Sequence, residues 1–374
     1  MSPRETLLWT VVAAVTFVGL AAYFGEVDNN DGYQYVSIAE NIRSTGHIST
    51  SLVHFDTERE HATIPAPETT FPPGYSAFIS LVSILGPGPD FAAEIVSVLG
   101  AILVALFLCK LCLVIGCSVN AARFAVILWL ANSYALAFSR TVASESLFAA
   151  TITAAILLLL VSDQTLRRDE AVPRTLTWAF ILAGLSAWIR YAGYFIFCGF
   201  LLYALVLLLM KVSRKIVVLQ SLLAGGSLIT ALLVRNFLLT STWRGGNTIP
   251  FSNPIAEIAR NGVGALTKLV FGDYARADLR VPVIGLCAVI VLVAVALIRT
   301  NGRFPLSRPV FLLTGLICVY SALMFYAGLH TPINFGARMF FPILPLILAV
   351  LGWFFSWTVE SLSPPRFAND NWLL

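Results

Sequence analysis

The chain contains a series of long apolar stretches, and this feature constrains its fold more than any other. An α-helix needs about 20 mostly apolar residues to cross a bilayer core about 30 Å thick. The composition agrees, because 58% of the 374 residues are hydrophobic, 12% are charged and the mean hydropathy is +0.84. We therefore predict an all-α, polytopic membrane protein with about ten transmembrane helices. These cover residues 7–25, 91–110, 121–139, 145–162, 176–192, 194–210, 216–236, 281–298, 309–328 and 339–358.

One apolar stretch, Phe71 to Leu85, differs from the others in length and in its ends. It has only about 15 residues, begins with Phe71-Pro72-Pro73 and is followed by a run of Gly and Pro. A helix of this length is too short to span, so we expect an interfacial or re-entrant helix.

The distribution of charge predicts the orientation of the chain. If the Phe71–Leu85 stretch does not span, both termini are cytoplasmic, and the short cytoplasmic connections carry most of the basic residues. The outer segments are then net acidic, although the whole chain has a formal charge of +4. This pattern predicts a multi-pass protein of the bacterial cytoplasmic membrane. It does not indicate a nucleic-acid partner, because the polar segments contain no basic run with interleaved aromatics.

The predicted topology consists of one transmembrane domain, residues 1–360, and a cytoplasmic tail, residues 361–374. Its two long loops, residues 26–90 and 238–280, both lie on the outer side. We expect the first loop to carry the chemistry and to contain amphipathic juxtamembrane helices, one of them over residues 33–44. The second loop is rich in aromatic and glycine residues, and it is either a cover on the acceptor side or a plain surface loop.

An acidic pair, Asp28 and Asp31, follows the first apolar stretch directly. From spacing alone, Asp31 is expected to be the N-cap of the short helix, and a catalytic carboxylate is the alternative. Asp28 has three alternatives: a second carboxylate beside Asp31, half of a divalent-metal site, or a solvated turn residue.

Several arginines lie at the predicted outer ends of helices, each flanked by apolar sequence. They are Arg140, Arg190, Arg235 and Arg338. Guanidinium groups bind phosphate through paired hydrogen bonds, so these residues are candidate phosphate ligands. The alternative is that they snorkel to the membrane interface. We expect Glu145 to pair with one of them without being catalytic.

Histidines and cysteines give weaker signals. His47, His54 and His61 recur every seven residues, but the intervening sequence has no helical pattern, so we do not expect them to converge on a metal. The six cysteines all lie within or at the ends of apolar runs, so no disulfide framework is implied.

Short motifs along the chain resemble one known enzyme superfamily. Residues 31–39, DGYQYVSIA, resemble the Asp-x-x-x-Tyr-x-x-Ile-Ala segment that follows the first helix of GT-C glycosyltransferases, with Tyr35 as the tyrosine. Further segments resemble later landmarks of that superfamily in the same order: 71–75 (FPPGY), 144–148 (SESLF), 190–193 (RYAG), 235–240 (RNFLLT), and Arg338 with Pro342 and Pro345. The chain departs from the superfamily at Ala93-Glu94, where Arg or Lys is common.

The resemblance implies a GT-C-like fold and an inverting glycosyltransferase that uses a polyprenyl-phosphate sugar as donor. The acceptor would be a hydroxyl of a lipid-linked or envelope glycan, and the reaction would take place at the outer face of the membrane. Membrane lipids would surround the protein. Asp31 would be the general base. Arg190, Arg235 and Arg338 would bind the donor phosphate in a cavity at membrane level. Structural or substrate-loop roles would fall to Tyr35, Pro72, Pro73 and Glu145.

The chemistry of such a reaction fits a site with one essential carboxylate. A phosphate leaving group departs without protonation, so only a base for the acceptor hydroxyl is needed. A single displacement without a covalent intermediate inverts the anomeric centre. No cofactor is required, although the acidic pair permits Mg²⁺ or Mn²⁺. The alternative function is a transporter or flippase for a lipid-linked saccharide, which would be expected to carry ionisable groups near helix centres or paired broken helices.

Overall fold

Helices make up almost all of the regular structure in the computed structural model, which describes residues 3–24, 30–53, 63–167, 174–210, 214–243, 252–271, 307–330 and 336–362. In chain order the elements are α1 (Pro3–Phe24), α2 (Asn30–Thr45), β1 (Ser49–Thr50), β2 (Ala66–Pro67), α4 (Gly74–Ser83), α5 (Pro89–Val114), α6 (Val119–Ala131), α7 (Ser133–Arg140), α8 (Glu145–Arg167), α9 (Thr175–Ile189), α10 (Gly193–Leu209), α11 (Lys215–Thr240), α12 (Ile255–Phe271), α14 (Arg308–His330), α15 (Ala337–Phe340), the 3-10 turn η2 (Phe341–Ile343) and α16 (Leu344–Leu362). This confirms the predicted all-α class.

Six helical units of the described chain are long and apolar enough to cross a membrane: α1, α5, α8, α11, α14 and the unit formed by α15, η2 and α16. The bent pair α6 and α7 makes a seventh if it is counted as one span. The helices α9 and α10 occupy predicted spans but have only 15 and 17 residues. Ten spanning helices are therefore not confirmed, and the predicted helix 281–298 lies outside the described residues.

The predicted continuous helix over residues 121–139 was wrong, because the chain bends by 57° between α6 and α7. Asn132 lies at the bend in an extended conformation, and its side chain accepts hydrogen bonds from the backbone N–H groups of Tyr134 and Ala135. An asparagine that caps the next helix in this way ends one helix and starts another.

The helix α12 was not predicted, since the 238–280 segment was expected to be a loop. Its buried residues Ile258, Ala265 and Leu269 lie on one face of the helix. This face packs against α14 and α15, and Asn132 donates to the Leu269 carbonyl oxygen at 2.7 Å. Packing on the bundle therefore decides the structure of this segment.

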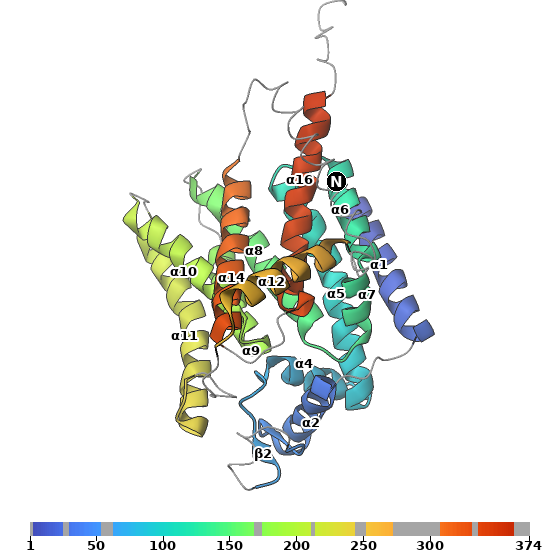
Figure 1. The fold of residues 1–374 in the computed structure, drawn as a ribbon, viewed down its shortest axis with the longest axis vertical. Coiled ribbons are helices and arrows are strands. Elements are labelled where there is room, and N and C mark those ends of the chain that lie inside the picture. The colour runs from blue at the N-terminus through green and yellow to red at the C-terminus, as the bar shows by residue number, and fades with distance from the viewer. Residues whose placement is uncertain are drawn as a thin grey trace, which may run out of the picture.

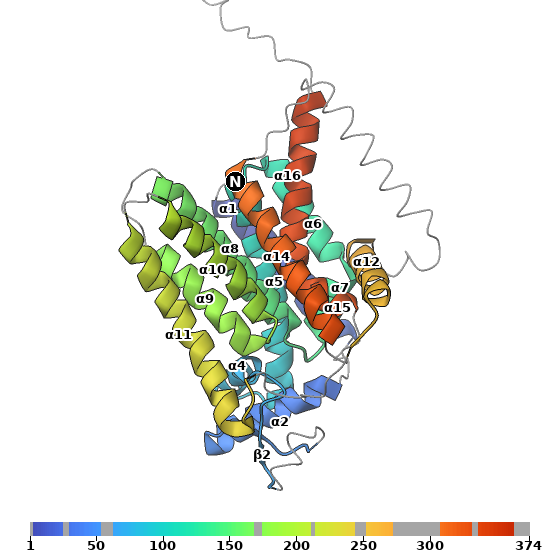
Figure 2. The same cartoon turned by 60° about the vertical axis from the view of Figure 1, so that its left-hand side comes forward.

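The first loop forms one end of the molecule. The elements α2, β2 and α4 lie together there, while the N-terminal end of α1 and the C-terminal end of α16 lie at the opposite end (Figures 1 and 2). The pairing of β1 with β2 sets Ser49 opposite Pro67 and closes the loop on itself. The start of α1 and the end of α16 thus both lie away from the motif-bearing loop.

The helix α2 covers the predicted amphipathic helix over residues 33–44 and extends it at its start. It begins at Asn30, so Asp31 lies in its first turn and is not the N-cap that spacing alone predicted. Its buried face includes Gln34, Tyr35 and Ile38, which follow the spacing of a helix that packs on one side.

The short helix α4 follows the buried residues Pro72 and Pro73, in the stretch predicted to be an interfacial or re-entrant helix. Its 10 residues extend only about 15 Å, half the thickness of a bilayer core. Gly74 allows α4 to approach the end of α9, because a Cβ atom there would lie 2.6 Å from the Trp188 carbonyl oxygen. The Pro-Pro-Gly step therefore brings the first loop against the backbone that leads into Arg190.

Candidate active site

Glu145 is the centre of a charged cluster at the loop end of the bundle. It lies in the first turn of α8 and is fully buried. Its Oε1 atom lies 2.6 Å from Nη1 of Arg190 and also accepts a hydrogen bond from Nε of Arg338. The prediction that Glu145 pairs with an arginine is confirmed. The structure adds that one oxygen atom, Oε1, contacts two arginines.

Close helix packing fixes the position of this glutamate. Gly100 of α5 lies against the backbone of Ser146 and Leu147, where a Cβ atom would come within 2.6 Å of the Leu147 nitrogen. Arg190 ends α9 as its C-cap residue, and Arg338 lies in the short helix α15. Three separate helices therefore contribute the carboxylate and the two cations.

Asp31 joins the cluster from α2. Its Oδ2 atom lies 2.6 Å from Nη1 of Arg338. The exposed fraction of the side chain is 28% for Asp31 and 33% for Arg338, against 0% for Glu145. Arg338 therefore bridges one buried carboxylate and one carboxylate that solvent and ligands can reach.

Tyr35 connects α2 to the same cluster. Its hydroxyl lies 3.0 Å from Oγ of Ser144, which also accepts a hydrogen bond from Nη1 of Arg190 at 3.0 Å. Its ring contacts Phe71 and Tyr75 edge-on. Burial raises the pKa of Tyr35 to about 12, so its hydroxyl stays neutral near pH 7. These contacts are compatible with the structural or substrate-loop role that the resemblance implies, which stays a prediction.

Arg235 lies in a second group of side chains and not beside Glu145. Its Nη2 atom donates to the backbone oxygen of Glu68 at 2.5 Å. Next to it, the Tyr191 hydroxyl donates to the backbone oxygen of Thr69 at 2.5 Å and accepts from Asn236 at 3.2 Å. These three side chains hold the segment that precedes Pro72, and we call them the loop clamp.

Glu68 supports the clamped segment from within. Its carboxylate is buried and accepts hydrogen bonds from the backbone N–H groups of Thr70 and Phe71, the latter at 2.9 Å. No sequence pattern pointed to this residue, because a lone glutamate in a polar loop usually faces solvent. Ser144, Tyr191 and Asn236 were not assigned to the site from the sequence either, although they directly neighbour Glu145, Arg190 and Arg235 in the chain.

We expect the substitution Arg235→Gln to loosen the segment at residues 68–71 without removing the arginine pair at Glu145. The Glu68 carbonyl loses a hydrogen bond from a charged donor, worth about 1.5 to 3 kcal/mol. Hydrogen exchange should then become faster at the Thr70 and Phe71 amides. As a control, Arg43→Gln removes an exposed arginine elsewhere in the loop and should leave this exchange unchanged. Equal exchange in the wild type and Arg235→Gln would contradict the clamp.

The remaining candidates are placed only in part. Asp28, His54 and His61 lie outside the described residues, and Arg140 ends α7. Within the described ranges, no group of three or more His, Cys, Asp and Glu side chains is close enough to hold a metal ion. A role for Mg²⁺ or Mn²⁺ at Asp28 and Asp31 therefore stays a prediction.

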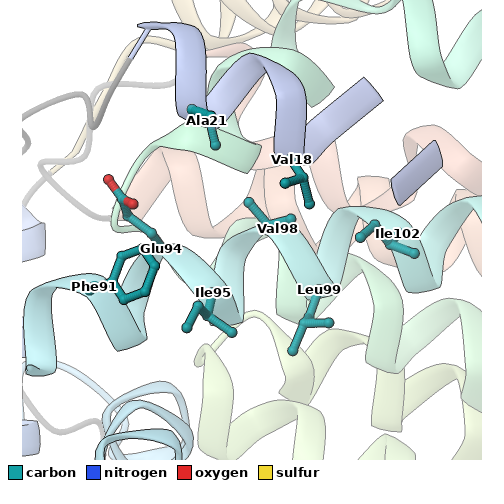
Figure 3. Close-up of a pocket in the computed structure, with 9 residues that line it drawn as sticks. Val18, Ala21, Phe91, Glu94, Ile95, Val98, Leu99 and Ile102 are labelled. Carbon is teal, nitrogen blue, oxygen red and sulfur yellow. The ribbon is translucent and has the colours of Figure 1, made fainter. Parts of the chain in front are cut away.

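An apolar groove of about 310 Å³ lies between α1 and α5. One wall is formed by Val18, Ala21 and Ala22 of α1, and the Glu94 carboxylate lies at one end (Figure 3). The other wall is formed by α5 residues Phe91, Glu94, Ile95, Val98, Leu99 and Ile102. None of the arginines of the charged cluster lines this groove. It is therefore not the arginine-lined cavity that was expected.

Comparisons with known proteins identify the fold. No protein-family model matches the chain, and no curated protein matches its sequence significantly. Among solved structures, ArnT from Cupriavidus metallidurans in the apo state superposes with a TM-score of 0.63 at 14% identity, over 96% of this chain and 60% of that one. The same protein bound to undecaprenyl phosphate gives a TM-score of 0.61 at 14% identity, over 97% and 61%.

A third solved structure is more distant. The Archaeoglobus fulgidus oligosaccharyltransferase, in complex with Zn and sulfate, gives a TM-score of 0.55 at 16% identity, over 95% of this chain and 49% of that one. The chain therefore spans about 60% of the length of ArnT and about half that of the archaeal enzyme. At these identities the likeness is one of fold. The arrangement of the helices, together with the ordered motifs from Asp31 to Arg338, shows that this chain has the GT-C fold.

Proposed function

We propose that the protein is an inverting membrane glycosyltransferase that moves a sugar from a polyprenyl-phosphate donor to an acceptor hydroxyl. The observation that carries this proposal is the cluster in which Glu145 and Asp31 share Arg338. It joins a reachable carboxylate to two guanidinium groups, which are the groups that this reaction needs. The solved ArnT structure with undecaprenyl phosphate bound, which has the same fold, supports a polyprenyl-phosphate ligand.

Asp31 is the general base in this proposal. It takes the proton of the acceptor hydroxyl as the hydroxyl oxygen attacks the anomeric carbon of the sugar. Its partial exposure allows an acceptor to reach it, whereas the fully buried Glu145 is out of reach. Glu145 instead fixes the two arginines, and Asp28 remains the candidate for a second carboxylate or a metal ligand.

Arg190 and Arg338 bind the donor phosphate in this proposal. Both guanidinium groups have N–H groups left over after their contacts with Glu145, and a guanidinium suits the oxygens of a phosphate. Arg235 has a different role, because its Nη2 atom is held by the backbone of the first loop. Arg235 is therefore assigned to the loop clamp, which holds the segment before Pro72, and not to the donor site.

The reaction is proposed to take place on the outer face of the bacterial inner membrane. The described apolar helices support a multi-pass membrane protein, and the basic character of the predicted cytoplasmic connections supports this orientation. The acceptor is proposed to be a lipid-linked or envelope glycan, since such acceptors lie at that face.

The test is chemical turnover by the purified protein in liposomes. We expect it to consume a polyprenyl-phosphate sugar and to release polyprenyl phosphate together with a glycosylated acceptor. A flippase would move the donor across the bilayer and leave the bond between sugar and phosphate intact. Donor recovered chemically unchanged on the opposite leaflet would therefore refute the proposal that the protein is a glycosyltransferase. The same assay with EDTA tests a contribution of Mg²⁺ or Mn²⁺.

A further inference from the structure

We propose that Arg338 exchanges partners during the reaction: its Nη1 group releases Asp31 and takes the donor phosphate, so that donor binding removes this cation from the base. This inference rests on the proposed function and assigns to one residue the coupling between donor binding and base activation. Knowing which residue is the base and which residues bind the phosphate does not say in what order these groups act, and the exchange supplies that order.

The geometry of the guanidinium group allows such an exchange. Arg338 contacts Glu145 through Nε and Asp31 through Nη1, the latter at 2.6 Å. Its two carboxylate partners thus occupy different N–H groups. Loss of the Asp31 contact leaves the Glu145 contact in place, so Arg338 stays in the site while one of its N–H groups becomes available.

Burial decides which partner leaves. Glu145 is 0% exposed and is also held by Arg190 at 2.6 Å, while the Asp31 side chain is 28% exposed. A buried charge that loses its partner is far more costly than a charge that turns toward solvent. An incoming phosphate therefore displaces Asp31 and not Glu145.

The charges of the four side chains favour the exchange. Among these four side chains the two carboxylates balance the two guanidinium groups, so a bound phosphodiester adds a negative charge beside Arg338. That charge competes directly with the more exposed carboxylate, Asp31, for the shared cation. The competition predicts that Asp31 weakens phosphate binding in the resting protein.

The bond changes of the transfer step move charge in the same direction. The acceptor oxygen forms a bond to the anomeric carbon, and its proton goes to Asp31, which becomes neutral. The bond between the anomeric carbon and the phosphate oxygen breaks, and its electron pair stays on the phosphate, which gains a second negative charge. A cation that has moved from Asp31 to the phosphate thus lies where negative charge accumulates.

The test measures binding of undecaprenyl phosphate, without sugar or acceptor, to the full chain in nanodiscs. We expect Asp31→Asn to bind this probe about tenfold more tightly than the wild type, because the competing charge is gone. Arg338→Gln should bind it more weakly than the wild type. In the Arg338→Gln background, the additional Asp31→Asn change should have no effect.

The matched control is Glu40→Gln, which makes the same chemical change on an exposed residue of α2 and should bind the probe like the wild type. If Arg338→Gln does not fold, Arg338→Lys replaces it, and the gain from Asp31→Asn should be smaller in that background. Equal or weaker binding by Asp31→Asn would overturn the exchange. Absence of binding by the folded wild type would overturn the proposed function as well.

Discussion

The substitution Asp31→Asn should lower the rate of sugar transfer by about two to four orders of magnitude, the usual contribution of a general base. Asparagine is close in size to aspartate but cannot accept the proton of the acceptor hydroxyl. The Asp31 side chain is partly exposed and lies at the start of α2, so the change should leave the fold intact. The measurement is transfer by equal amounts of folded protein, with donor binding followed in parallel.

The control for this prediction is Glu40→Gln, which lies on the same helix and changes a carboxylate to an amide. Glu40 pairs with Arg43 at the surface, where both side chains are 44% exposed, so transfer should be unchanged. Turnover by Asp31→Asn at the wild-type rate would exclude Asp31 as the base. A loss of both transfer and donor binding would instead indicate that Asp31 helps to hold the donor, for example through a metal ion.

The substitution Glu145→Gln should affect both stability and transfer. Glu145 is fully buried between two arginines, and its removal leaves Arg190 and Arg338 without their common counter-charge. Removing one partner of a buried ion pair costs about 3 to 5 kcal/mol. We therefore expect a clear drop in the thermal unfolding temperature in detergent, together with a loss of transfer per folded molecule, because both arginines lose their position.

A second buried carboxylate on the same helix separates these two effects. Asp163 is 3% exposed and pairs with Arg308 through both oxygens, at 2.8 and 2.9 Å. Asp163→Asn should lower stability as Glu145→Gln does, but it should leave transfer per folded molecule close to the wild type. Unfolding of Glu145→Gln at the wild-type temperature would contradict the structural role of Glu145.

Local sequence signals predicted much of the fold. Apolar length predicted α1, α5, α8, α11, α14 and α16 close to their observed positions, because the span of a bilayer is a constraint on each helix alone. The same signal failed at Asn132, where a side-chain cap breaks a continuous apolar stretch, and at α12, where packing against α14 and α15 buries a modest apolar face. In both cases the structure is decided by an interaction, a side-chain cap or a packing contact, that the length of an apolar stretch does not reveal.

The candidate site was predictable in its members but not in its pairings. The motifs singled out Asp31, Glu145, Arg190, Arg235 and Arg338 as a set, and most of the set meets in one cluster. Arg235 does not, since it holds the backbone of Glu68, a residue without any signal in the sequence. All of these arginines have similar apolar flanks, so flanking sequence cannot distinguish a phosphate ligand from a loop anchor.

The sequence by itself determined that this is a helical membrane protein with a polar, motif-bearing first loop, because apolar length and residue type are properties of each segment. The tertiary structure alone decided that Glu145 and Arg338, 193 residues apart, meet at one oxygen atom, and that Asp31 shares the same arginine. Such contacts depend on how α2, α8, α9 and α15 pack at one end of the bundle. Packing also makes one carboxylate buried and the other reachable, and this difference separates a structural acid from a candidate base.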